Sequence, residues 1–263
     1  MTASPSATPH PWDLHGRAAL VTGGAQGLGR GIADALAGAG VHVVVTARRR
    51  ERVEEAAEQI RAAGGAATPL PWDLSMPAEA PALVDAAASA AGVEAVDTLV
   101  HAAGIQVRKP VDSLTLEEFD EVHTVHLRSA FTLSQTVGAR LRERGLPGSV
   151  VLMGSLTSHL GIPHTAAYGS AKSGVLGLAR SLAVEWAAHD IRCNVIVPGY
   201  FHTELTDGLF QDPDRRDWVE SRIPMGRLGR ADDLGGLALL LASDAGSYIT
   251  GQAIAVDGGW LAA

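Results

Sequence analysis

Three residues near the middle of the chain have the types and the spacing that carbonyl chemistry needs. Ser155 follows the β-branched run VVLMG, and Tyr168 and Lys172 lie one helical turn apart in the segment AAYGSAKSG. If that segment is helical, the ammonium of Lys172 lies beside the phenol of Tyr168. One cation at about 4 Å, at an effective dielectric constant of about 20, contributes roughly 4 kcal/mol and lowers a phenol pKa of about 10 by roughly 3 units. The spacing therefore predicts that Tyr168 is an acid or base near neutral pH and that Ser155 orients the substrate oxygen.

Each of these residues alone also has an ordinary structural explanation. A tyrosine near a helix start is commonly a packing residue, a helical lysine is commonly solvated, and a serine after a strand often caps a turn. Their combination, downstream of a glycine-rich turn, favours catalysis. A Ser-His-Asp nucleophile is not favoured, because Ser155 lies in MGSLT rather than in a GxSxG turn.

The glycine-rich turn TGGAQGLG follows the first apolar run directly. Glycines at 23, 27 and 29 allow a sharp turn and a close approach to a pyrophosphate, and the N-terminus of the following helix offers free N–H groups to the anion. A triphosphate-binding loop is not favoured, because Arg30 and Gly31 stand where Lys and Ser or Thr are required. The turn predicts a dinucleotide site; a glycine turn without a ligand is the alternative. The predicted contacts within it are Gly23, Ala25, Gln26, Gly27, Leu28 and Gly29.

The end of the second apolar run indicates which dinucleotide is bound. NAD sites usually carry an acidic residue there, which hydrogen-bonds the ribose. This chain has Ala47, followed by Arg48 and Arg49. Guanidinium groups can bind a 2′-phosphate through paired charge-assisted hydrogen bonds. The sequence therefore predicts NADP(H), with Arg48 and Arg49 as the phosphate ligands, whereas Arg50 is expected to begin the next helix in solvent.

Short apolar strands alternate with longer helical stretches along the chain. This alternation is typical of a parallel sheet covered by helices on both faces, so the predicted fold class is α/β, doubly wound and Rossmann-type. The seven predicted strands are Ala18–Val21, Val41–Thr46, Ala66–Leu70, Thr98–His101, Ser149–Met153, Ile191–Val197 and Ala253–Val256. The predicted helices lie near 28–39, 50–63, 77–91, 115–144, 166–188 and 231–242.

The chain organisation predicted from composition is one catalytic domain over 13–263, preceded by a disordered tail at 1–12. The 263 residues are 46% hydrophobic, which suffices for one large core. The segment 199–230 interrupts the alternation after a strand. Because ligands of open α/β sheets bind beyond the carboxyl ends of the strands, we predict that it is a substrate lid.

Charge and cysteine content limit the partners and the compartment. The formal net charge is −8 and the basic residues are scattered, so we expect neither nucleic acid nor an anionic membrane as a partner. No apolar run reaches the roughly 20 residues of a membrane span. The single cysteine, Cys193, cannot form an internal disulfide and is expected to be a small buried residue. This is consistent with a reducing cytoplasm. The expected partner is a small carbonyl or alcohol substrate.

A metal site is not expected. His123 and His126 have the spacing of neighbours on one helix face, but no third ligand stands at a suitable local spacing.

Together these motifs resemble the short-chain dehydrogenase/reductase family over about residues 13–263. The shared landmarks are TGGAQGLG, WDL, HAAGI, Ser155 with YGSAK, PGYFHT and VDGGW. The resemblance implies a sheet ordered 3-2-1-4-5-6-7 and a homotetramer. It also implies that Tyr168 and Lys172 contact the cofactor. By position it adds Asp73 and Leu74 near adenine, Ala103 and Gly104 near the ribose, and Pro198, Gly199 and Thr203 near the nicotinamide.

The chain departs from the family pattern in two places. His101 and Ala102 stand where the family commonly has two Asn residues, and His126 occupies the place of an Asn often counted as a fourth catalytic residue. In the family that residue holds a relay water, mainly through its backbone carbonyl. Two interpretations of His126 remain open: a catalytic residue that shuttles protons, or a structural histidine bonded to nearby backbone.

Within the family, the chain looks most like gluconate 5-dehydrogenase and 2-deoxy-D-gluconate 3-dehydrogenase. The segments AGIQVRKP and RIPMGRLG carry that likeness, which implies a sugar acid or a related polar ketone as substrate. Arg108 is the candidate carboxylate partner. The full set of candidate substrate contacts is Gln106, Arg108, His159, His164 and Tyr200.

Two other functions remain as alternatives. One is an NAD(H)-preferring 3-oxoacyl-thioester reductase of the same fold, although no basic patch for an acidic acyl carrier is evident. The other is a non-catalytic NADP(H)-binding sensor.

Overall fold

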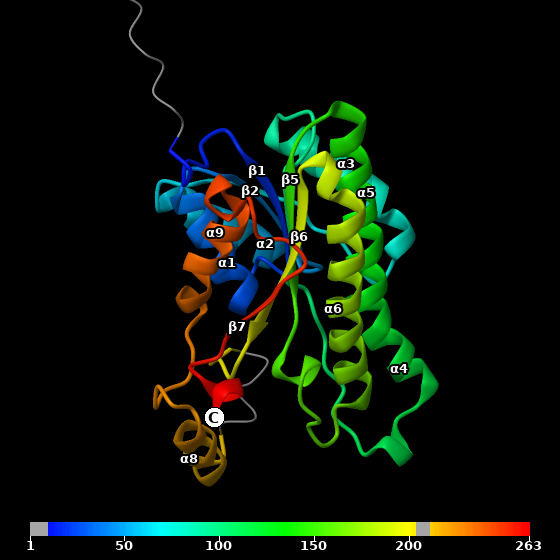
Figure 1. Cartoon of the computed structure of the whole chain (residues 1–263), viewed down its shortest axis with the longest axis vertical. Coiled ribbons are helices and arrows are strands. Elements are labelled where there is room, and N and C mark those ends of the chain that lie inside the picture. Colours follow the sequence, from blue (N-terminus) through cyan, green and yellow to red (C-terminus); the bar gives the residue numbers. More distant parts are fainter. Residues whose placement is uncertain (1–9, 204–210) are drawn as a thin grey trace, which may run out of the picture.

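The computed structural model describes residues 10–203 and 211–263. Most of the predicted tail at 1–12, and residues 204–210 of the predicted lid, lie outside this range. The described chain forms one parallel seven-stranded sheet in the order β3-β2-β1-β4-β5-β6-β7, which confirms the doubly wound α/β, Rossmann-type prediction (Figure 1). The strands are β1 Ala18–Thr22, β2 His42–Thr46, β3 Ala66–Pro69, β4 Thr98–His101, β5 Gly148–Met153, β6 Ile191–Pro198 and β7 Ala253–Val256.

Helices cover both faces of the sheet (Figure 1). Apolar residues of α1, α2 and α9 pack on one face, and those of α3, α5 and α6 pack on the other. Each parallel connection needs a crossover, and these helices are the crossovers. The helices are α1 Gly27–Gly38, α2 Arg50–Ala62, α3 Ala80–Ala91, α4 Leu116–His123, α5 Ser129–Arg144, α6 Ala166–Trp186, α8 Pro213–Arg222 and α9 Gly235–Ala242.

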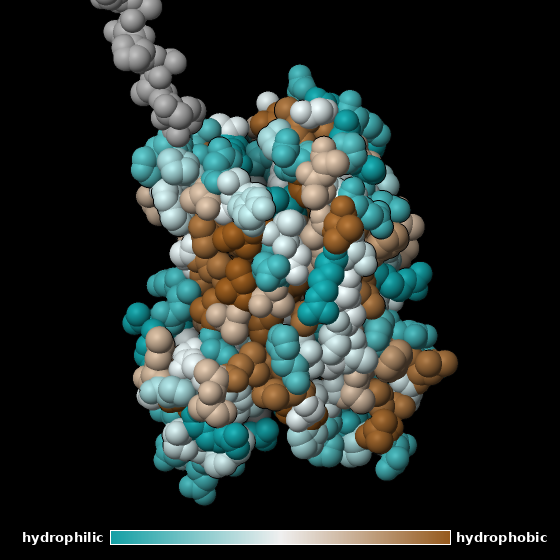
Figure 2. All heavy atoms as spheres, viewed as in Figure 1, coloured by the Kyte–Doolittle hydropathy of each residue, from teal (hydrophilic) through white to brown (hydrophobic). Residues whose placement is uncertain are grey.

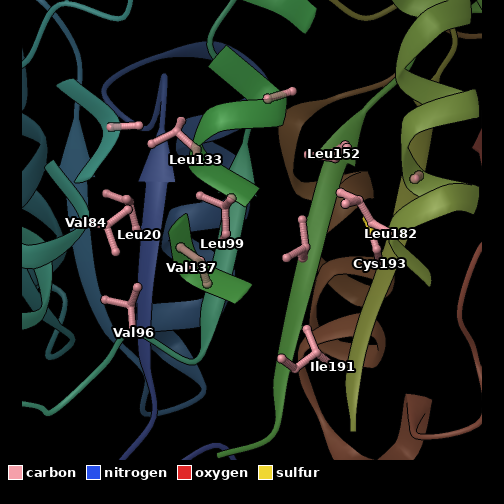
Figure 3. Close-up of a cluster of buried hydrophobic side chains, with 14 of the residues drawn as sticks. Leu20, Val84, Val96, Leu99, Leu133, Val137, Leu152, Leu182, Ile191 and Cys193 are labelled. Atoms are coloured by element: carbon pink, nitrogen blue, oxygen red, sulfur yellow. The ribbon is translucent and has the colours of Figure 1, made fainter. Parts of the chain in front are cut away.

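The core consists of branched aliphatic side chains between these layers. In Figure 3, Leu20 of β1 and Leu99 of β4 lie near Val84, Leu133 and Val137 from α3 and α5. All five side chains are at most 1% exposed. Cys193 of β6 belongs to the same cluster, and burial raises the pKa of its thiol to about 12, as befits a packing residue.

The predicted helix over 115–144 is present, but it is not α-helical throughout. Thr115 caps α4 in a reciprocal pair of hydrogen bonds with Glu118, and α4 ends at His123. A π-helical turn then spans Thr124–Arg128 before α5 begins at Ser129. A π turn accommodates one extra residue and is frequent at functional sites. Here it places Val125 and His126 against the carboxyl end of the sheet, where both line a large cavity.

No helix of the described residues is long and apolar enough to span a membrane.

Candidate active site

A cavity of about 780 Å³ lies at the carboxyl ends of β1, β4, β5 and β6. Parallel α/β sheets present their loops together at this edge. All the residues predicted to be catalytic or to bind the cofactor line this cavity, as do three of the five predicted substrate contacts. The catalytic candidates in its wall are Ser155, Tyr168, Lys172 and His126. The cofactor candidates are Gly23, Ala25, Gln26, Gly27, Leu28, Gly29, Arg48, Arg49, Asp73, Leu74, Ala103, Gly104, Pro198, Gly199 and Thr203.

Two glycines of the first turn occupy positions where any side chain would collide. Gly23 has a φ of +67°, and a Cβ there would lie 2.7 Å from the backbone nitrogen of Ala103. A Cβ on Gly29 would lie 2.4 Å from the carbonyl oxygen of Gly23. The backbone therefore closes tightly on itself and leaves the N-terminus of α1 open to the cavity, which is the geometry that a pyrophosphate needs.

One end of the cavity is basic. Arg48 and Arg49 follow β2 directly, and Nη2 of Arg49 donates a 3.0 Å hydrogen bond to Oε1 of Gln26 in the glycine turn. Arg52, from the first turn of α2, also lines the cavity, and sequence reasoning missed it. Arg52 lies four residues after Arg48, and this spacing could have indicated that the two side chains face the same site. Arg50 does not line the cavity; its guanidinium lies 3.4 Å from Glu54.

The catalytic candidates meet where β5 and α6 approach each other. Ser155 follows the end of β5, and its side chain shares a hydrogen bond with the phenol of Tyr168. That hydrogen bond, and the charge of Arg108, lower the pKa of Tyr168, but burial outweighs both and the net shift is upward.

Lys172 differs from its predicted arrangement. It is on the same helix face as Tyr168, but its Nζ donates a 2.7 Å hydrogen bond to the carbonyl of Met153 and lies 5.6 Å from the centre of the Tyr168 ring. Burial lowers the pKa of the Lys172 ammonium to about 7. The ammonium therefore binds a backbone carbonyl, and the pKa of Tyr168 is raised rather than lowered as expected. The physical reason is that the buried ammonium pairs with a backbone carbonyl at the sheet edge.

The predicted substrate contacts divide into two groups. Gln106, Arg108 and Tyr200 line the cavity, whereas His159 and His164 line a neighbouring cavity of about 640 Å³. Thr157 and Ile162 border both cavities, so the loop between β5 and α6 separates the two histidines from Ser155. The structure does not bring His159 and His164 to the wall of the catalytic cavity, because their loop places them in the neighbouring one.

Further lining residues carry no chemical motif and were not predicted. Most are apolar or small side chains whose orientation depends on the tertiary packing. They are Ala47, Trp72, Ser75, Ala102, Ile105, Glu121, Val125, Met153, Gly154, Leu156, Thr157, Ile162 and Phe201.

An aromatic cluster supports the wall that Tyr200 contributes. The rings of Tyr200 and Trp260 lie 4.7 Å apart, and the guanidinium of Arg222 in α8 lies 5.1 Å from Trp218 and 5.2 Å from Trp260. In Figure 1, α8 and the C-terminus lie together at this end of the molecule. The described part of the predicted lid is thereby joined to the C-terminal segment.

Within residues 10–203 and 211–263, no group of three or more His, Cys, Asp or Glu side chains is placed to hold a metal ion. His123 instead bonds the carbonyl of Phe119 through Nδ1 at 2.9 Å, and its Nε2 lies 3.2 Å from Oγ of Ser170.

Known proteins resemble this chain over nearly its whole length. The family described as enoyl-(acyl carrier protein) reductase matches residues 23–261. The 2-dehydro-3-deoxy-D-gluconate 5-dehydrogenase of Bacillus subtilis is 40% identical over 250 residues, covering 95% of this chain and 96% of that protein. The 3beta-hydroxysteroid dehydrogenase 1 of Eggerthella lenta is 38% identical over 250 residues, covering 94% of each. A solved gluconate 5-dehydrogenase from Burkholderia cenocepacia, in complex with NADP and tartrate, is 36% identical with a TM-score of 0.90, and the match covers 96% of this chain and 98% of that one.

Proposed function

The chain belongs to the short-chain dehydrogenase/reductase family, and on that basis we propose that it is an NADP(H)-dependent oxidoreductase acting on a secondary alcohol or ketone of a sugar acid or related polar compound. The observation that carries this proposal is one cavity in which Ser155, Tyr168 and Lys172 lie at one end and Arg48 and Arg49 at the other. NADP(H) is long enough to reach from one end to the other, with its nicotinamide at the first end and its 2′-phosphate at the second. The relatives that act on gluconate-type acids support the substrate class.

The cavity fits NADP(H) by its shape and by its donor groups. Gly23 and Gly29 leave space that side chains would fill, and α1 opens there with its N–H groups. Arg48 and Arg49 supply the charge for a 2′-phosphate. Asp73 and Leu74 would hold the adenine end. When bound, NADP(H) supplies the hydride or accepts it.

Tyr168 moves the proton in the mechanism that we propose. In reduction, its phenol donates a proton to the carbonyl oxygen while the carbonyl carbon receives hydride; in oxidation, the phenolate takes that proton back. The side chain of Ser155 is hydrogen-bonded to the phenol of Tyr168. A substrate oxygen that contacts the phenol can therefore also contact Ser155, which orients that oxygen. Lys172 supplies a buried amino group that donates to the carbonyl of Met153 and would hold the reacting end of the cofactor.

Arg108 determines the substrate class in this proposal. It lines the cavity, and its charge reaches the phenol of Tyr168. A guanidinium in the same cavity wall can pair with the carboxylate of a sugar acid while the carbonyl of that acid meets Tyr168.

Replacing Arg108 by Ala is the test of this substrate class. The KM for 5-dehydro-D-gluconate is expected to rise about ten- to hundredfold, the equivalent of one lost charged hydrogen bond, whereas kcat/KM for an uncharged polar ketone such as D-fructose changes less than about threefold. Lys109→Ala is the matched control. It removes a neighbouring cation that pairs with Glu118 and lines the other cavity, so it should affect neither substrate. Equal losses on the acid and on the uncharged ketone would contradict the carboxylate role.

We propose that the protein works as a single-domain homotetramer in the cytoplasm. β7 is an edge strand, and hydrophobic residues gather on the surface over α9 and β7 in Figure 2. An exposed apolar sheet edge favours pairing with a second copy of the chain.

Light scattering of the purified protein should give about four times the 27.2 kDa of one chain. Ala255→Glu places a charge at the exposed position of β7 and should lower that mass. A monomeric wild-type protein would contradict the proposal.

A further inference from the structure

The backbone of Tyr200, which lines the catalytic cavity, is held from both sides. Before it, the N–H of Gly199 donates a 3.0 Å hydrogen bond to the carbonyl of Val256. After it, the carbonyl of Tyr200 accepts a 2.8 Å hydrogen bond from the N–H of Gly229. A Cβ on Gly199 would lie 2.6 Å from Cα of Asp257, so the chain after β7 packs directly against this wall. The backbone is therefore fixed, and the neighbours of the Tyr200 ring decide how the ring lies.

Trp260 is the aromatic neighbour of that ring. The two ring centres lie 4.7 Å apart at an interplanar angle of 62°, which is an edge-to-face contact. Aromatic rings in this geometry attract each other beyond the area that they bury. Both rings also pack against a small buried cluster, which consists of Val219, Ile223 and Leu228. Trp260 therefore restricts the orientation of the Tyr200 ring.

Trp260 is itself fixed by the turn that carries it. The carboxylate of Asp257 accepts hydrogen bonds of 2.9 Å from the N–H groups of Gly259 and Leu261, on either side of Trp260. Gly259 has a φ of +93°, and a Cβ there would lie 2.9 Å from Cγ of Pro224. The segment that follows α8 thus touches this turn, and the turn presents the indole to the cavity wall.

Arg222, the last residue of α8, contacts two indoles. Its Cζ lies 5.2 Å from the ring centre of Trp260 and 5.1 Å from that of Trp218, and the two rings lie 6.2 Å apart. A cation within about 6 Å of an aromatic ring centre is attracted to the ring. Trp218 and Arg222 are both exposed, so solvent weakens this contact. We therefore expect Arg222 to have a smaller effect than Trp260.

We propose that Trp260 is a positioning residue of the substrate site: its indole sets the orientation of the Tyr200 ring in the cavity wall, and Arg222 stabilises that indole from α8. Trp260 is not among the described residues that line the cavity, so its effect on a ligand passes through Tyr200. The inference deepens the proposed function. It rests on that function for the substrate alone, because the contact between the two rings can be measured without turnover.

The first test measures the ring contact by ¹⁹F NMR of protein labelled with 3-fluorotyrosine. The chain contains three tyrosines, so its signals can be assigned with Tyr200→Phe and Tyr248→Phe. Trp260→Ala should shift the Tyr200 signal and leave that of Tyr248 unchanged. Trp12→Ala is the matched control, because it removes an exposed indole that is not part of the cluster. A Tyr200 signal that does not move in Trp260→Ala, or that moves as far in Trp12→Ala, would overturn the inference.

The second test is a double-mutant cycle on substrate binding. Trp260→Ala should raise the KM for 5-dehydro-D-gluconate about tenfold and lower kcat less than about threefold, because the wall moves while Ser155, Tyr168 and Lys172 stay in place. Trp260→Phe keeps an aromatic ring and should hold the KM within about threefold of the wild-type value. In a Tyr200→Ala background, Trp260→Ala should change the KM less than about twofold, because the two side chains act as a unit.

Arg222→Met should raise the same KM about two- to fivefold, the size of an exposed cation–π contact. Arg216→Met is its control, because it removes a cation of the same helix that pairs with Glu220 instead. Equal effects of these two variants would overturn the role of Arg222.

The outcome of the cycle separates a positioning role from a purely structural one. Additive losses on replacing Trp260 and Tyr200 would mean that the indole supports the fold without acting through Tyr200, and would overturn the inference. Melting temperature and the dissociation constant of NADPH are the folding controls. If the wild-type protein does not turn over 5-dehydro-D-gluconate, the proposed substrate class fails, whereas the ¹⁹F measurement still decides whether Trp260 sets the Tyr200 ring.

Discussion

Replacing Tyr168 by Phe is expected to lower kcat by about two to four orders of magnitude, the range that general acid–base catalysis supplies. Phe keeps the ring that packs edge-on against His126 and the contacts with Val122 and Ala171. It removes only the hydroxyl, which bonds Ser155 and is the proposed proton donor. The dissociation constant of NADPH should change less than about threefold, because no hydroxyl is needed to hold the phosphates.

The control for this change is Tyr248→Phe, which removes a hydroxyl from a fully exposed ring that does not line the cavity. Steady-state rates and calorimetric titration of both variants with NADPH separate catalysis from binding. A Tyr168→Phe enzyme that retains more than about a tenth of the wild-type kcat would exclude Tyr168 as the acid. If the wild-type protein binds NADPH but turns over no ketone, alcohol or acyl thioester of a broad panel, the sensor alternative replaces the enzyme.

The sequence placed Ser155, Tyr168 and Lys172 together because each follows a local rule: the end of a strand, and two positions one turn apart on a helix. It could not predict which partner the ammonium of Lys172 selects. That choice depends on the carbonyl of Met153, which reaches the same edge only when β5 pairs with β4 and β6. Local spacing therefore predicted that these residues meet, but not that the ammonium binds Met153 or that burial raises the pKa of Tyr168.

Strand positions were predictable because buried parallel strands are short, apolar and β-branched. The strand order came from the family resemblance, since pairing is non-local. The π turn at Thr124–Arg128 could not be predicted, because helical periodicity continues on both sides of it and one inserted residue only rotates the later face. That rotation determines where His126 points.

The positions of His159 and His164 also could not be predicted from local sequence. His159 and His164 follow the proposed catalytic serine, Ser155, in sequence, yet the loop between β5 and α6 places them in the second cavity. Part of the reason is backbone geometry: His164 has a φ of +64°, a turn conformation that the sequence does not signal at a histidine.

Replacing both Arg48 and Arg49 by Ala is expected to weaken NADPH binding by about a hundred- to ten-thousandfold while changing NADH binding less than about threefold. In the proposed site, each guanidinium would contribute one charged hydrogen bond to the 2′-phosphate, at about 1.5–3 kcal/mol for each. Arg49 is also expected to stabilise the glycine turn, because its guanidinium donates a hydrogen bond to Gln26 in that turn. The single Arg49→Ala variant is therefore expected to weaken NADH slightly as well.

Calorimetric titration with NADPH and NADH at matched salt measures this selectivity, because exposed charges are screened by salt. Arg50→Ala is the matched control: it removes the adjacent cation, which lies by Glu54 and outside the cavity, and both affinities should stay unchanged. If NADPH and NADH lose affinity equally in the double variant, the arginines bind the shared part of the cofactor and not the 2′-phosphate. If NADPH affinity survives, Arg52 is the next residue to replace, because it is the remaining guanidinium that lines the same end of the described cavity.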